Sequence, residues 1–310
     1  MQSRLSKIVY KSLKRYVGPM NACEATDYVK TRQDMEDLAR MLKIDKNVEL
    51  TCINLENCSM EYVHVPHAPD NKIIMYIHGG GFTSGSVICS RKYITEFCLK
   101  ARLNAISCEY RLAPEHTYPA ALEDCVEIYE YLLSNGYKGR DIAITGESAG
   151  GTLSLNLVLY LKDHHMDMPA AVCAMCPVGD ITGRLDSRER NIKVEALLQF
   201  DLDGKIRETY VGNADAKDPY ISPIYGDFHN FPPLLLQLGE NEILYDDSVM
   251  LYEKAKNAGV KVSLSIWEHM WHGFQLVVGM PEANEAIQEA MEFMSKYLKN
   301  DRYRSFRVIR

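Results

Sequence analysis

Short β-rich segments alternate with helical patterns along most of the chain, and this order limits the possible folds more than any other feature. Several segments are almost continuously apolar, which is typical of strands covered on both faces. The alternation predicts βαβ units and a mainly parallel, doubly wound, eight-stranded α/β sheet. Strands are expected at residues 48–55, 60–65, 73–77, 105–108, 142–145, 171–176, 234–238 and 262–267. Helices are expected at residues 91–101, 120–133, 149–161, 248–257 and 282–298. Only a turn separates the first two strands, so they are expected to form an antiparallel hairpin.

The composition is that of an ordinary globular protein without a strong charge of either sign. Of the 310 residues, 46% are hydrophobic and 25% are charged, and the formal net charge is −7. This balance argues against nucleic acid or an anionic membrane as a partner. No apolar run approaches the roughly 18–20 residues that cross a bilayer, so no stable membrane insertion is expected.

The cysteines favour a reducing environment. They are nine in number, hence odd, and the first residues lack the pattern of a secretion signal. Free thiols and a cytoplasmic location are therefore expected. Cys173 and Cys176 form a C-x-x-C pair inside an apolar run. Core packing is favoured there over redox or metal chemistry.

Two segments fall outside the sheet pattern. Residues 1–46 contain an amphipathic helical pattern, and residues 182–217, here called the inserted segment, are charged and helical in pattern. A structureless loop of that length would be unusual inside a compact domain. The two segments are therefore predicted to pack together as a helical cap over one end of the sheet. Residues 47–181 and 218–310 would then form a single catalytic core. An interfacial membrane anchor is the alternative for the basic N-terminal helix.

The strongest chemical motif lies between the fifth expected strand and the following helix. Residues 146–150 read Gly-Glu-Ser-Ala-Gly, which matches the G-x-S-x-G nucleophile elbow. Such a turn lifts the Ser148 hydroxyl above the sheet, and glycine on either side avoids collisions with the neighbouring strand and helix. Ser148 is therefore the candidate nucleophile for attack on a carbonyl carbon.

A glycine-rich loop follows the third expected strand. It reads His-Gly-Gly-Gly at residues 78–81. Backbone N–H groups in such a loop can stabilise the oxyanion of acyl transfer, and Gly80, Gly81 and Ala149 are the expected donors. A dinucleotide loop would need glycine at position 84, which is Ser84, and no G-K-[ST] sequence follows for a phosphate loop. His78 is expected to hold the loop by hydrogen bonding.

The candidate base is chosen by its place along the chain. In this arrangement the order is serine, then acid, then histidine, each after a strand. His272 follows the last expected strand and precedes a glycine, so it is favoured over His269. The acid is expected after the seventh strand. The acidic residues Glu240, Glu242, Asp246 and Asp247 crowd that position, and the residues alone leave the choice among them open.

Several motifs together resemble the hormone-sensitive-lipase-like esterases of bacteria, a branch of the α/β-hydrolases. They are H-G-G-G-F at 78–82, Y-R-L-A-P-E-H at 110–116, P-A-A-L-E-D at 119–124, G-E-S-A-G-G at 146–151 and W-H-G-F at 271–274. The resemblance implies a cap, no metal and no organic cofactor. It also implies Glu242 as the acid, where the family usually has aspartate, with Ile243 in place of the usual proline. Arg111 and Glu115 resemble the family's structural charge pair.

The function expected from these residues is a serine carboxylesterase that hydrolyses small, short-acyl esters through an acyl-enzyme. An amidase, deacetylase or peptidase using the same triad is the alternative within the enzymes. A ligand-binding receptor on the same fold, such as the plant gibberellin receptors, is the alternative outside them. Those receptors lack the catalytic histidine, whereas His272 is present here. A homodimer paired through the last strand is left open.

Overall fold

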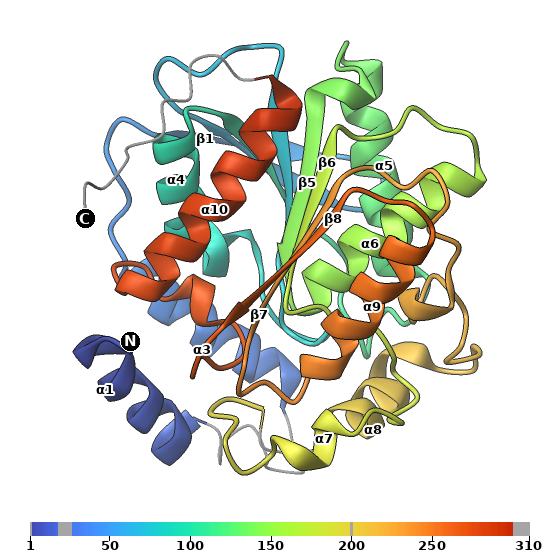
Figure 1. Ribbon diagram of the computed structural model, residues 1–310. Helices are drawn as coiled ribbons and strands as arrows, with labels where there is room; N and C mark the ends of the chain where they lie inside the picture. Colours follow the sequence, from blue (N-terminus) through green and yellow to red (C-terminus); the bar gives the residue numbers. More distant parts are fainter. Residues whose placement is uncertain (1, 18–26, 199–200, 300–310) are drawn as a thin grey trace.

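An eight-stranded sheet runs through the middle of the molecule, with helices on both faces (Figure 1). The structure is a computed structural model and describes residues 2–17, 27–198 and 201–299. The strand order is β1-β2-β4-β3-β5-β6-β7-β8. The strand bounds are β1 Glu49–Asn54, β2 Ser59–His64, β3 Ile73–Ile77, β4 Asn104–Glu109, β5 Ile142–Glu147, β6 Ala171–Met175, β7 Leu234–Gly239 and β8 Val262–Trp267. β2 pairs antiparallel with both β1 and β4, and every other pair is parallel.

The central strands are apolar because both of their faces are covered. β3, β5, β6 and β7 are buried along their whole length. Along β3, Ile73, Met75 and Ile77 join one hydrophobic core, while Ile74 and Tyr76 join a second core on the opposite face. This is the period-2 alternation of a strand, and it explains why the sequence shows a continuous apolar run there.

Helices divide between the two faces (Figure 1). α4 (Val87–Ala101) and α10 (Pro281–Leu298) contact each other and cover one face. α5 (Ala120–Ser134), α6 (Ala149–Asp163) and α9 (Tyr245–Asn257) cover the other. The expected fold class is therefore confirmed. All eight expected strands are present, whereas α4 begins at Val87 and α9 at Tyr245, in each case before the expected start.

The N-terminal segment and the inserted segment contain the remaining helices. The first holds α1 (Arg4–Ser12), a π-helical turn (Leu13–Val17) and α3 (Tyr28–Arg40). The second holds α7 (Ser187–Arg190), α8 (Leu202–Ile206) and a π-helical turn (Arg207–Val211). Short single-turn helices (Gly139–Asp141, Pro223–Tyr225 and Phe274–Leu276) complete the described elements. Parts of the predicted cap, at residues 1, 18–26 and 199–200, lie outside the described residues.

These segments gather at one end of the sheet, where α1, α3, α7 and α8 lie in Figure 1. The Tyr10 hydroxyl donates to the carbonyl of Val194 at 2.9 Å, and the Tyr10 ring lies 6.0 Å from that of Trp271. The Lys205 ammonium lies 6.0 Å from the Tyr28 ring. Contacts thus join the two segments, while the division into a cap and a catalytic core stays a prediction. Among the described helices, none has both the length and the hydropathy to cross a membrane.

Candidate active site

Ser148 lies on a sharp turn between β5 and α6. Its φ of 55° and ψ of −123° are strained for a residue with a side chain. The turn is tight because glycines allow close approach on both sides. A Cβ on Gly146 would lie 2.5 Å from the carbonyl oxygens of Gly150 and Ile77, and one on Gly150 would lie 2.0 Å from that of Ile77. The half-buried Ser148 side chain is thereby held at the end of the sheet.

A chain of hydrogen bonds runs from Ser148 through His272 to Glu242. The Oγ of Ser148 lies 2.8 Å from Nε2 of His272, and Nδ1 of His272 lies 3.0 Å from Oε2 of Glu242. His272 is 4% exposed and Glu242 is fully buried. The structure thus brings Ser148 together with Glu242 and His272, which lie 94 and 124 positions farther along the chain.

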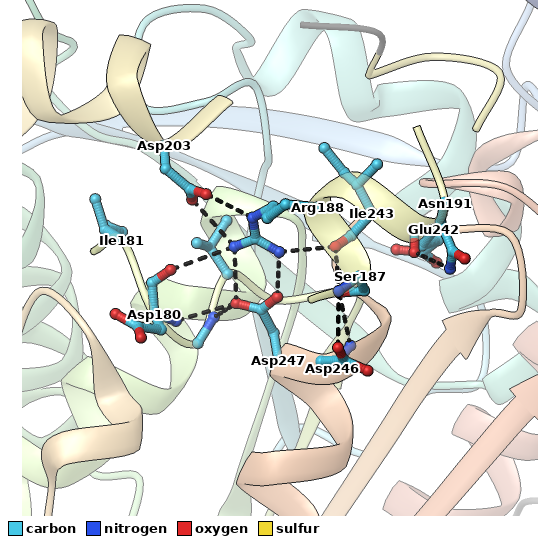
Figure 2. Close-up of polar contacts among 12 residues, drawn as sticks. Asp180, Ile181, Ser187, Arg188, Asn191, Asp203, Glu242, Ile243, Asp246 and Asp247 are labelled. Carbon is cyan, nitrogen blue, oxygen red and sulfur yellow. Dashed lines mark hydrogen bonds and ion pairs between the residues drawn. The ribbon is translucent and has the colours of Figure 1, made fainter. Parts of the chain in front are cut away.

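The crowded acidic residues after β7 have separate partners. Besides His272, Glu242 accepts from Gly239 N at 2.5 Å. Asp246 accepts from Ser187 N at 2.8 Å, and Asp247 accepts from Gly179 N at 2.7 Å and from Arg188 (Figure 2). Glu240 accepts from His269 N at 2.9 Å. Of these acids, only Glu242 contacts His272 among the described residues.

The glycine loop lies beside the elbow. Gly80 and Gly81 adopt φ values of 114° and 62°, which a residue with a side chain rarely adopts. Within the described part of the chain, neither of their N–H groups donates to another protein group. Nδ1 of His78 donates to Gly79 O at 2.7 Å, and its ring stacks on Tyr110 at 4.3 Å. These contacts agree with the expected loop-holding role of His78.

The comparisons with known proteins agree with this architecture. The profile of the family described as the α/β hydrolase fold matches residues 74–276. The chain belongs to the α/β-hydrolase family. An esterase of Acinetobacter venetianus is 35% identical over 264 residues, covering 84% of this chain and 87% of the relative. An acetyl-hydrolase of Streptomyces hygroscopicus is 31% identical, and the match covers 78% of this chain and 81% of the relative.

Solved structures place this α/β-hydrolase in the branch that its motifs resemble. A structure of EstE5 soaked with p-nitrophenyl butyrate has a TM-score of 0.89 and 33% identity, covering 96% of this chain and 99% of that one. An esterase described as a member of the bacterial hormone-sensitive lipase family has a TM-score of 0.89 and 29% identity over the same shares. The resemblance to the hormone-sensitive-lipase-like esterases is therefore confirmed.

Carboxylate charge beside His272 in the hydrolase stabilises the imidazolium form. Burial by itself lowers the pKa of His272, whereas the hydrogen bond to the Glu242 carboxylate and the charge of that carboxylate raise it. Burial raises the pKa of Cys176, which makes it a neutral thiol at neutral pH. The negative charge beside the imidazole therefore comes from carboxylate, and it stabilises the imidazolium that forms when His272 takes a proton.

Sequence reasoning missed the role of Glu147. Its Oε1 accepts from Gly79 N at 2.6 Å and its Oε2 accepts from the Tyr76 hydroxyl at 2.7 Å. Burial raises its pKa to about 7, although these two hydrogen bonds lower it. Glu147 therefore ties the elbow to the glycine loop. The available signal was a carboxylate at the end of a buried strand, where charge is otherwise rare.

The expected charge pair of Arg111 with Glu115 is wrong. Arg111 instead donates to the buried Asp124 on α5, with its Nη2 2.7 Å from the carboxylate. Glu115 pairs with Arg32 of α3 at 2.8 Å. The reason is geometric, because the backbone N–H of Arg111 also donates to Asp124 and fixes the arginine on that side.

Within the residues that the structure describes, two groups of side chains bring atoms that can bind a metal ion within 4.8 Å of one another: Cys176, Glu242 and His272, and Cys58, Asp124 and Glu127. The Glu242–His272 pair already forms the hydrogen bond described above, and Asp124 pairs with Arg111. Both Cys173 and Cys176 are buried free thiols, as core packing predicts. The absence of a required metal or cofactor stays a prediction.

Proposed function

We propose that the chain is a serine carboxylesterase that hydrolyses small, short-acyl esters, with Ser148, His272 and Glu242 as its catalytic triad. One observation carries the proposal: the unbroken series of contacts from Ser148 Oγ to Nε2 of His272 and from Nδ1 to Glu242. It stands at a nucleophile elbow and beside a glycine loop in which the N–H groups of Gly80 and Gly81 donate to no other group among the described residues.

Each step follows from this arrangement. His272 takes the hydroxyl proton as Ser148 Oγ attacks the carbonyl carbon, which gives a tetrahedral oxyanion. The N–H groups of Gly80, Gly81 and Ala149 donate to that oxyanion. His272 then passes its proton to the alcohol oxygen, the alcohol leaves, and the acyl group stays on Ser148. Water then attacks the acyl-enzyme while His272 takes its proton, and His272 returns that proton to Ser148 Oγ as the acyl–oxygen bond breaks and the carboxylic acid departs.

The preference for short acyl groups is supported by the relatives. Two of them are named acetyl-hydrolase and ethyl acetate hydrolase, the second from Pseudomonas putida at 27% identity. The N-terminal and inserted segments lie at the end of the sheet that carries Ser148, and as a cap they would limit the depth of the acyl pocket. The substrate partner proposed is thus a small ester.

The proposal is tested by hydrolysis of p-nitrophenyl esters from acetate to decanoate. We expect a maximum at acetate or butyrate. The Ser148→Ala variant is expected to lower kcat by about 10⁶-fold, as in other serine triads. A maximum at long chains would contradict the shallow pocket. An unchanged kcat in a folded Ser148→Ala variant would contradict the whole assignment.

The proposal also includes an oligomeric state and a cellular location. β8 is an edge strand with Ile266 42% exposed, so a homodimer paired through β8 is proposed and is checked by sedimentation equilibrium. The free cysteines among the described residues support a reducing compartment such as the cytoplasm. They are Cys52, Cys58, Cys89, Cys98, Cys108, Cys125, Cys173 and Cys176.

A further inference from the structure

One buried carboxylate near the triad has no part in the mechanism above. Glu195 belongs to the inserted segment and is fully buried. Acidic side chains are seldom fully buried unless they are paired. Its Oε1 accepts from the backbone N–H groups of Ala196 at 2.7 Å and Leu197 at 2.8 Å. The carboxylate is thereby held in a fixed orientation by its own segment.

The same carboxylate reaches the loop that carries the candidate base. Both oxygens of Glu195 lie 3.4 Å from the backbone nitrogen of His272, which donates to them. These contacts join residues 77 positions apart in the chain. They fix the peptide from which the imidazole projects, so Glu195 acts on the position of the base.

We propose that Glu195 is a positioning residue for His272, because it holds the backbone that carries the imidazole and places a second carboxylate beside it. The inference rests on the proposed function, since it concerns how the base of that triad is held. Two carboxylates then flank one histidine: Glu242 from the loop after β7 and Glu195 from the inserted segment.

The charges of these groups are coupled. Burial raises the pKa of Glu195, a positive His272 lowers it, and Glu242 raises it. Protonation of His272 therefore favours the ionised form of Glu195, and ionised Glu195 favours the imidazolium in return. Among the described residues, the titratable groups that contact the imidazole or interact with its charge come from four parts of the chain: Glu147 and Ser148 at the end of β5, Cys176 after β6, Glu242 after β7, and Glu195 in the inserted segment.

The start of the inserted segment holds the other triad loop. The Ser187 hydroxyl and the Arg188 guanidinium both donate to Ile243 O, at 2.7 Å and 2.8 Å. Asn191 donates to Glu242 O at 2.8 Å (Figure 2). Residues 187–197 thus contact the loop of the acid first and the loop of the base second. One segment therefore contacts both loops, and Glu195 is the residue by which it places a carboxylate near the base.

The test compares Glu195→Gln with the wild-type chain on p-nitrophenyl butyrate across pH. Glutamine keeps an oxygen for the backbone N–H groups and removes the charge. We expect kcat to fall about tenfold. We also expect the acidic limb of the pH profile of kcat/KM to move down by about one pH unit, because His272 loses a neighbouring negative charge. KM is expected to stay within about twofold, since no substrate contact is removed.

The matched control is Glu189→Gln, which removes an exposed carboxylate from the same segment and is expected to leave kcat and the acid limb unchanged. Glu195→Asp keeps the charge but withdraws it by one methylene, and smaller changes in the same direction are expected. The Glu195→Asp variant also tests the inference if the Glu195→Gln variant does not fold. A folded Gln or Asp variant with wild-type kcat and acid limb overturns the inference. Wild-type protein without Ser148-dependent ester hydrolysis would instead overturn the proposed function.

Discussion

The loops that carry Ser148 and Glu242 are held in place by different means. At the elbow, the position of Ser148 follows from backbone sterics, because Gly146 and Gly150 leave no space for a side chain against Ile77 O. The loop that carries the proposed acid Glu242, residues 240–244, is here called the acid loop, and side chains from the inserted segment fix its backbone. Arg188 stands at the centre, bonded to Asp203, Asp247 and Ile243 O (Figure 2).

This difference affects how well each loop tolerates substitutions. A turn held by backbone contact cannot be repaired by repacking, whereas a loop held by side chains can lose one contact and keep its fold. The acid loop also depends on residues far along the chain, since Arg188 lies 59 positions from Asp247. The comparison therefore predicts failure of folding at the elbow and graded loss at the acid loop.

The largest expected effect is at the elbow. Gly150→Ala places a Cβ 2.0 Å from Ile77 O and 2.5 Å from His78 O, neither of which can move without shifting β3. We expect destabilisation above about 4 kcal/mol, with most of the chain insoluble or unfolded. Gly136→Ala is the control, because a Cβ there meets nothing within 4 Å and only the positive φ is strained. Similar unfolding midpoints in urea for both variants would contradict the steric account.

The second-largest effect is expected at the acid loop. Burial lowers the pKa of Arg188, but Asp247 and Asp203 raise it overall, so the guanidinium is charged. Arg188→Met leaves two buried carboxylates, Asp203 and Asp247, without their cation. A loss of about 3–5 kcal/mol of unfolding free energy is expected, with reduced kcat in the folded fraction.

Arg190→Met is the matched control for that loss. Arg190 pairs with Asp246, but its side chain is 52% exposed. Exposed ion pairs contribute about 0–1 kcal/mol, so the unfolding free energy should change by no more than that. Equal losses for the two variants would mean that the buried Arg188 cluster does not hold the loop.

The same difference explains what the sequence could and could not predict. The sheet and the elbow were predictable because strand periodicity and the G-x-S-x-G turn are local features. The choice of Glu242 among neighbouring acids depended on the family resemblance, since their partners Ser187, Arg188 and His272 come from distant segments. Glu195 was missed because the charged pattern of the inserted segment gives no sign that this residue is buried.

A smaller effect is expected from the carboxylate beside Ser148. The pKa of Glu147 is raised to about 7 by burial, so between about pH 4.5, the ordinary pKa of this group, and pH 7 the folded chain holds a proton that the unfolded chain has released. Stability from this group is therefore complete below about pH 4.5 and is lost as pH rises to about 7, by up to roughly 3 kcal/mol. Glu147→Gln should flatten this slope in urea unfolding between pH 5 and 8. A slope identical to that of the wild type would contradict the shift.

The smallest expected effect tests the length of the acid. Glu242 reaches both Gly239 N and Nδ1 of His272, and aspartate is one methylene too short to keep both from the same backbone position. Glu242→Asp should lower kcat by about 10- to 100-fold with little change in unfolding free energy, because misplacement by about 1 Å carries a penalty of that size. Asp246→Asn, measured on the same ester, should leave kcat nearly unchanged because Asp246 contacts Ser187 and Arg190 instead. The reverse ranking of the two variants would move the acid from Glu242 to Asp246.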